Sequence, residues 1–127
     1  MPELPEVEST AQVIAPLIIG KQLSDFVLFK ERLMQSGSLS QLVGSHVTGV
    51  TRRGKYLLIF FMGGKTLCIH FVMTGRLSSE KRELQESLRL VFEGTTLYLT
   101  DSRNWAKCWV LDTYKLLRTK PLAGLGM

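Results

Sequence analysis

The first eight residues, MPELPEVE, combine two prolines with three carboxylates. Removal of the initiator methionine would make Pro2 the N-terminal residue and its nitrogen a secondary amine. An α-amino group titrates near ~7.7–8, so a fraction of it is unprotonated and nucleophilic at neutral pH. Its attack on an aldehyde-like carbon gives an iminium ion, which is the basis of Schiff-base catalysis. Glu3, the next residue, could transfer protons during that reaction.

The same stretch also fits the start of a helix. Pro5 suits the first helical turn, and Glu6 and Glu8 suit the positive end of the helix dipole. We expect Pro16 to kink or end this helix and Gly20 to close it. Apolar residues recur at the spacing of one helix face, at Val7, Ala11, Ile14 and Ile18. Spacing alone therefore leaves both a catalytic and a purely structural terminus open.

After Gly20 the pattern changes from helix to strand. Gly63-Gly64 and Glu93-Gly94-Thr95 each separate two apolar runs, as in β-hairpins. Tyr56–Met62 has apolar residues at both parities, which predicts a strand covered on both faces. The expected strands are Leu23–Lys30, His46–Arg53, Tyr56–Met62, Leu67–Val72, Leu88–Glu93, Thr96–Thr100 and Lys107–Asp112. The predicted fold class is mostly β with a leading helix: a β-sandwich flanked by an N-terminal α-helix.

A chain of 127 residues has room for one domain with a substantial core. We place this domain at residues 1–114. The segment Ser78–Ser87, rich in charged residues, is expected to be an exposed loop. Residues 115–127, which end in PLAGLGM, are interpreted as a linker.

The charge balance favours a polyanionic partner. Lysine and arginine number 16 against 11 acids, a net charge of +5, and three of those acids lie in the first eight residues. A basic excess of this kind is typical of nucleic-acid-binding surfaces. A basic surface with no such partner explains the charge about equally well.

The sequence indicates a cytoplasmic protein with no membrane partner and no cofactor bound by this chain. Its longest apolar runs fall far short of the ~20 residues that cross a bilayer. The acidic start does not resemble a signal segment. Cys68 and Cys108 lie in apolar stretches with no CxxC pair, so we expect buried free thiols and no metal site.

Four stretches in order, MPELPEVE, TRRGKYLLIFF, IHFVMTGRL and YLTDSRNWAKCWV, are similar to motifs of one family. They resemble the N-terminal domain of the formamidopyrimidine-DNA glycosylase and endonuclease VIII family, bifunctional glycosylases that act on oxidised bases. The similarity runs from Met1 to about Gly126. Leu4 favours the formamidopyrimidine branch, since the endonuclease VIII branch typically has glycine there.

The resemblance implies a base-excision repair glycosylase with abasic-site lyase activity on oxidised purines in double-stranded DNA. By this resemblance Pro2 is the nucleophile that attacks C1′, and Glu3 protonates the sugar ring oxygen. Glu6 is a supporting acid, and Lys55 grips a phosphate beside the lesion. The DNA-binding residues implied by the motifs and by the basic cluster beside Lys55 are Arg52, Arg53, His70, Met73, Arg103, Asn104 and Trp105. Each role has a physical basis, because C1′ is reached only when the nucleotide leaves the stack and an apolar wedge such as Met73 can fill the gap.

One motif departs from the family pattern. The family commonly has Asp-x-Arg-Arg-Phe, whereas this chain has Asp101-Ser102-Arg103-Asn104-Trp105. The second arginine of the family motif reads the base opposite the lesion. Trp105 can still stack on a base, but Asn104 lacks the guanidinium fork. The usual preference for an opposite cytosine is therefore not expected to transfer directly.

The family pattern continues with a helix-two-turn-helix element and a four-cysteine zinc finger, which are not found in these 127 residues. Zinc is expected only in that second domain. Without it we expect weak DNA binding and an exposed apolar segment containing Leu116, Leu117, Leu122 and Leu125, through which the chain could form a homodimer. The alternative function is a non-catalytic β-sandwich module that binds nucleic acid or a protein partner. Retention of Met1 would favour that alternative, because Pro2 would then be acylated.

Overall fold

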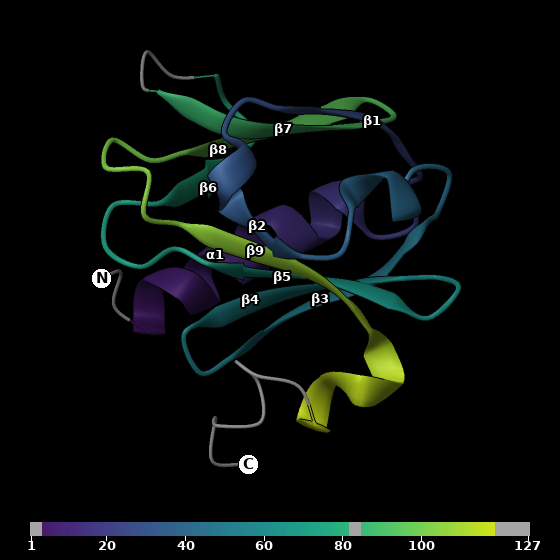
Figure 1. Ribbon diagram of the computed structural model, residues 1–127. Helices are drawn as coiled ribbons and strands as arrows, with labels where there is room; N and C mark the ends of the chain where they lie inside the picture. Colours follow the sequence, from purple (N-terminus) through teal and green to yellow (C-terminus); the bar gives the residue numbers. More distant parts are fainter. Residues whose placement is uncertain (1–3, 82–84, 119–127) are drawn as a thin grey trace.

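The computed structural model describes residues 4–81 and 85–118 as one helix followed by two β-sheets (Figure 1). The helix α1 spans Leu4–Ile18. It buries Val7, Ala11, Ile14 and Ile18, the face that the sequence spacing predicts. Pro16 lies in its last turn and the helix continues to Ile18. Gly20 follows with a positive φ of 85°, and its amide donates to the Val47 carbonyl.

The first sheet has four strands in the order β1-β7-β8-β6, and its pairs are antiparallel. The second has five strands in the order β2-β9-β5-β4-β3, where only the pairing of β2 with β9 is parallel. The strand bounds are β1 Leu23–Leu28, β2 Met34–Ser36, β3 Val47–Arg53, β4 Tyr56–Phe61, β5 Lys65–His70, β6 Arg76–Ser78, β7 Glu86–Phe92, β8 Thr95–Thr100 and β9 Lys107–Asp112. The described residues also contain three short 3-10 helices: η1 Glu31–Leu33 between β1 and β2, η2 Leu39–Gln41 between β2 and β3, and η3 Thr113–Arg118 after β9.

The core lies between the two sheets and under α1, which contacts mainly β3. Alternate residues of β4 face this core, for example Leu57 and Ile59. Leu58, between them, is equally buried but packs on the opposite face with Cys68. The prediction that this strand is covered on both faces is therefore confirmed. The fold class is also confirmed, because the described residues form a mostly β structure with a leading helix.

All seven predicted strands are present, with ends that shift by a few residues. The sequence patterns missed β2 and β6, which have three residues each. The predicted loop Ser78–Ser87 is shorter than expected, because Ser78 ends β6 and Glu86 begins β7. Cys68 and Cys108 are buried free thiols, as predicted. Among the described residues, no helix is long and apolar enough to cross a membrane.

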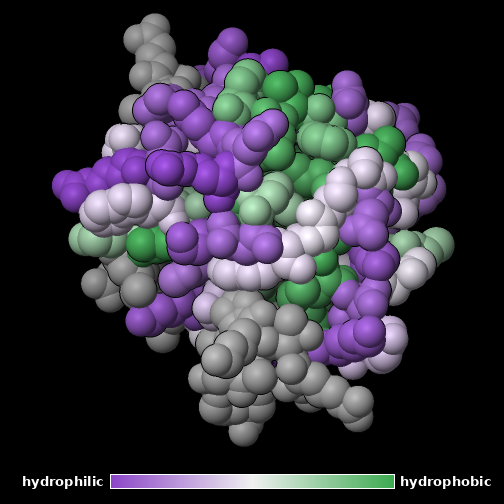
Figure 2. Space-filling model, in the orientation of Figure 1, coloured by the Kyte–Doolittle hydropathy of each residue, from purple (hydrophilic) through white to green (hydrophobic). Residues whose placement is uncertain are grey.

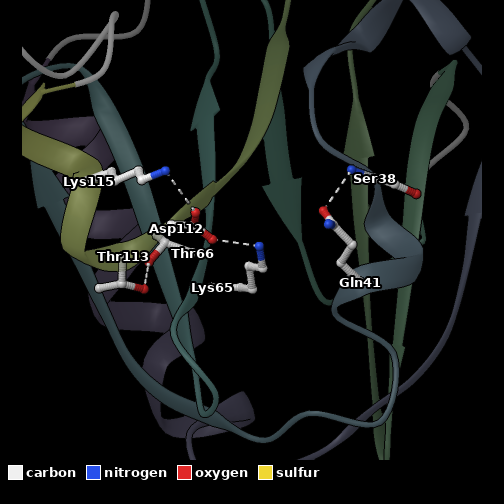
Figure 3. A network of polar contacts seen from close by, with 7 residues as sticks. All are labelled: Ser38, Gln41, Lys65, Thr66, Asp112, Thr113 and Lys115. Carbon is white, nitrogen blue, oxygen red and sulfur yellow. Dashed lines mark hydrogen bonds and ion pairs between the residues drawn. The ribbon is translucent and has the colours of Figure 1, made fainter.

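The segment after β9 packs on the second sheet, so the proposed boundary at residues 114–115 falls inside η3. Asp112 lies between Lys65 and Lys115, at 2.6 Å and 3.7 Å (Figure 3). The hydroxyls of Thr66 and Thr113 are 2.7 Å apart, which ties η3 to β5. Figure 3 also shows Ser38 and Gln41, which form the capping box of η2.

The expected exposure of Leu116 is wrong. Its side chain is 5% exposed and packs against Leu58, Cys68 and Leu111. The apolar outer face of β4, β5 and β9 explains this, because a leucine folded back on it leaves water. The side chain of Leu117, and all of Leu122 and Leu125, lie outside the described residues. Self-association through them stays a prediction.

Candidate nucleic-acid interface

Three connections meet at the end of the fold where α1 begins (Figure 1). They are the β3–β4 turn with Lys55, the β5–β6 loop at 71–75 and the β8–β9 loop at 101–106. Strand register brings them together, since Arg53, Tyr56, His70 and Lys107 are successive partners across β3, β4, β5 and β9. Figure 2 shows hydrophilic residues on this side of the molecule, with hydrophobic ones among them. Pro2 and Glu3 precede α1 and lie outside the described residues.

His70 occupies the middle of this row. Its ring stacks at a tilt on Tyr56, with centroids 4.9 Å apart. Its Nε2 is buried and has no hydrogen-bond partner. Burial lowers the pKa of His70, and the positive charges of Lys55 and Lys107 lower it further. A neutral imidazole with one unsatisfied nitrogen, flanked by two lysines, is suited to an anionic ligand.

The two arginines before the turn differ in their surroundings. Arg52 donates from Nη1 to the Gly54 carbonyl at 3.0 Å, and its Nε lies 3.6 Å from Glu8 Oε1. It therefore braces the turn against α1. Gly54 has φ of 60°, a conformation that favours glycine. Lys55 is exposed at the tip of this turn, next to Arg53. A DNA contact by Arg52 or Arg53 stays a prediction.

Met73 and Trp105 sit on two different loops and both project apolar surface into solvent. They are 47% and 42% exposed. Each directly follows a residue with a positive φ: Val72, with φ of 63°, precedes Met73, and Asn104, with φ of 56°, precedes Trp105. Left-handed conformations of this kind cost free energy in non-glycine residues and tend to mark functional loops. The structure thus presents two wedge-shaped side chains at the same end of the fold.

Asp101 holds the two loops together. Its buried carboxylate accepts hydrogen bonds from the backbone amides of Arg103, Trp105 and Ala106, at 3.0, 2.6 and 2.6 Å. It also accepts from the Thr74 hydroxyl of the other loop. Burial acts to raise the pKa of Asp101, but these four hydrogen bonds outweigh it and the net pKa is lowered. The carboxylate is therefore charged, and both of its oxygens are used in hydrogen bonds that hold the loops.

The middle of the Asp101 loop carries groups that are available to a ligand. The Arg103 guanidinium lies 5.0 Å above the Trp105 ring, a cation–π contact that extends the aromatic surface. Asn104 Oδ1 is buried and unpartnered. A cavity of about 470 Å³ adjoins Asn104 and Trp105. Its lining residues are Arg32, Gln35, Val72, Asn104, Trp105, Ala106 and Lys107.

Glu6 lies on α1 beside the β5–β6 loop, which carries Met73. Its carboxylate is 3.5 Å from Arg76 Nη2, while Arg76 Nη1 donates to the Gly75 carbonyl at 2.8 Å. Gly75 must stay small, because an added Cβ would lie 2.8 Å from the Phe71 carbonyl oxygen. The arginine thus connects the Met73 loop to the start of α1, which would carry the catalytic terminus.

The structure brings Glu6, Lys55, His70, Met73 and the loop of Arg103, Asn104 and Trp105 to one end of the fold. Their roles in catalysis or DNA binding stay predictions. Sequence reasoning missed three contributors: Asp101, Arg76 and Lys107. The aspartate was visible as the first residue of a motif, but its role depends on burial. No group of three or more His, Cys, Asp or Glu side chains suited to a metal occurs within residues 4–81 and 85–118.

Known proteins are similar to this chain in sequence. Residues 1–108 match the family described as formamidopyrimidine-DNA glycosylase N-terminal domain. The formamidopyrimidine-DNA glycosylase of Geotalea uraniireducens is 40% identical over 121 residues, covering 88% of this chain and 44% of that protein. The Ligilactobacillus salivarius protein of the same name is 31% identical over 134 residues, covering 99% and 49%. The chain thus spans about half the length of the curated relatives it matches.

Solved structures show the same fold. The MutM (Fpg) protein of Thermus thermophilus superposes with a TM-score of 0.88 at 32% identity, over 99% of this chain and 46% of that one. A Lactococcus lactis Fpg (MutM) complex with FAPY-dG-containing DNA superposes with a TM-score of 0.84 at 26% identity, over 91% and 46%. The chain belongs to the formamidopyrimidine-DNA glycosylase family, and the matched part is the family's N-terminal domain.

Proposed function

We propose that this chain is the catalytic domain of a base-excision repair glycosylase that removes oxidised purines from double-stranded DNA and then cleaves the abasic site. Family membership supports the class of enzyme. One observation carries the proposal to this chain. Lys55, His70, Met73 and Trp105 converge at the end of the fold where α1 begins, directly after Pro2 and Glu3 in the sequence.

The chemistry follows from a free Pro2 amine. Its nitrogen attacks C1′ of the damaged nucleotide, and the electrons of the C1′–N bond leave with the base. Proton transfer to the sugar ring oxygen, by Glu3, opens the ring and leaves an iminium between proline and C1′. The iminium withdraws electrons, so a proton is lost from C2′ and the 3′ phosphate is expelled. Hydrolysis of the remaining iminium frees Pro2.

The described residues support that chemistry by holding the DNA. Lys55 and His70 would bind the phosphates beside the lesion, where a neutral imidazole donates one hydrogen bond and a lysine supplies charge. Met73 and Trp105, both partly exposed, would enter the stack when the nucleotide is extruded, which would offset part of the unstacking cost. Arg76 links the Met73 loop to Glu6 on α1. The same arginine would therefore help to position both the inserting Met73 and the catalytic N-terminus.

The test is borohydride trapping. The chain, with absence of Met1 verified by mass spectrometry, is incubated with abasic-site duplex and borohydride at high protein concentration. Reduction of the iminium should give a covalent protein–DNA adduct that peptide mapping places on Pro2. Pro2→Gly should retain some trapping through its primary amine, and Glu3→Gln should lose more base excision than abasic cleavage. Binding without any adduct would refute the catalytic assignment and favour a non-catalytic nucleic-acid-binding module.

A further inference from the structure

A row of basic residues continues past Lys55 and His70, the two phosphate-binding residues that the family motifs imply. The basic row comprises Arg53, Lys55, His70, Lys107 and Arg32, and it crosses the second sheet at one end. Lys107 is the register partner of His70 on the neighbouring strand β9. Register partners on antiparallel strands have Cα atoms about 4.5–5.5 Å apart. Lys107 is therefore one strand further along from His70.

Arg32 extends the row by another strand. It lies in η1, immediately before β2, and β2 pairs in parallel with β9 from Met34 opposite Cys108. Arg32 and Lys107 both line the cavity of about 470 Å³ beside Trp105. The described residues around that cavity include no carboxylate. No ion pair involving either cation occurs in the described part of the chain.

Two unsatisfied polar atoms flank the same place. His70 Nε2, on one side of Lys107, and Asn104 Oδ1, on the cavity wall, are both buried without a hydrogen-bond partner. Buried polar atoms without partners are uncommon and point to a missing ligand or water. The exposed Trp105 ring borders the same cavity. The two cations suit a phosphate, whereas Asn104 Oδ1, which only accepts hydrogen bonds, suits a donor group on a base, and the Trp105 ring offers a stacking face.

We propose that Arg32 and Lys107 form a second phosphate-binding subsite, which holds the DNA backbone beyond the phosphates at Lys55 and His70. This inference rests on the proposed function. Each strand of a duplex carries a phosphate for every ~3.4 Å of helix axis, so a backbone bound at His70 has further phosphates within reach of the neighbouring strands. The subsite extends the DNA track across β5, β9 and the start of β2.

Salt dependence of binding tests the subsite. Each phosphate contact contributes about 0.9 to the slope of log affinity against log salt. The chain and its Lys107→Gln and Arg32→Gln variants are titrated with abasic-site duplex at 50–200 mM salt. The slope of each variant should be smaller than that of the parent by about 0.9. The factor by which its affinity falls between 50 and 200 mM salt should therefore be about threefold smaller than for the parent. Lys21→Gln is the matched control, because Lys21 lies at the other end of the sheet beside Val47.

A second measurement locates the contact. Single uncharged methylphosphonate linkages are placed in turn along the duplex, and one should weaken the parent but not Lys107→Gln. Unchanged slopes in both Gln variants, together with a reduced slope in Lys55→Gln, would overturn the subsite and leave the proposed function standing. Absence of DNA binding by the parent chain would instead overturn both. Equal slope losses in Lys21→Gln and Lys107→Gln would also overturn it, since the effect would then reflect net charge alone.

Discussion

The Thr74 hydroxyl donates a hydrogen bond to the Asp101 carboxylate, which joins the loop of Met73 to the loop of Trp105. The two loops are far apart in the chain, and each contains a strained non-glycine residue. The same carboxylate organises three backbone amides of its own loop. The loops that carry the exposed Met73 and Trp105 side chains are thus both held by the buried Asp101 carboxylate. Its hydrogen bonds oppose the backbone strain in either loop.

Asp101→Asn should destabilise the fold by about 3 kcal/mol, because hydrogen bonds to a charged group are strong and the new amide cannot accept at both positions. Thr74→Val removes one donor and should cost about 1–2 kcal/mol. Urea unfolding of the two variants and the parent measures both values. Ser102→Ala, an exposed change in the same loop, serves as the control. Parent-like stability of Asp101→Asn would show that the carboxylate does not organise the loops.

The lowered pKa of Asp101 also predicts a pH dependence of stability. A carboxylate whose folded pKa lies below its unfolded value stabilises the fold above the unfolded value of about 3.9. This contribution is lost as pH falls through the folded pKa. The stability difference between the parent and Asp101→Asn should therefore be constant near neutrality and shrink below about pH 4. Urea midpoints measured from pH 7 to pH 3 test this, and a difference that stays constant to pH 3 would contradict it.

Trp105→Ala should weaken DNA binding while leaving the fold intact. The side chain is 42% exposed, and stacking of an aromatic ring on a base contributes about 1–3 kcal/mol. Stability should change by no more than about 0.5 kcal/mol, as for surface substitutions generally. Tyr114→Ala is the control, an aromatic residue 78% exposed on η3 away from the loops. Fluorescence anisotropy with abasic-site duplex gives the affinities, and equal losses in the two variants would reject a specific role for Trp105.

His70 should titrate below its ordinary value of about 6.5, since burial and then the charges of Lys55 and Lys107 lower its pKa. Lys107→Gln removes one repelling charge, so the pKa of His70 should rise. NMR titration of the imidazole protons measures the midpoints, with Lys21→Gln as the comparison. No rise in Lys107→Gln would mean that the Lys107 ammonium lies away from the ring. Because the folded pKa is lowered, the neutral ring stabilises the fold above about pH 6.5, and this is lost at lower pH.

The fold class, the leading helix and most strands could be predicted from the residues alone, because these features depend on local periodicity. The helical face of Val7 to Ile18 and the two-sided apolar pattern of β4 are readable without knowing any partner. The resemblance to the family motifs singled out Lys55, His70, Met73 and Trp105 as candidate site residues, and their roles in DNA binding stay predictions. Strands of three residues, such as β2 and β6, are too short to show a period of two.

Which distant residues meet could be seen only once the chain was folded. Lys107 stands beside His70 because of the register between β5 and β9, and Leu116 is buried because η3 folds onto the outer face of that sheet. In the sequence, Asp101 looks like any polar loop residue. In the structure it is buried from water, and its hydrogen-bond partners are Thr74 and three backbone amides. Such roles arise from pairing register and desolvation, which depend on residues far away in the chain and so leave no periodic signal around the residue itself.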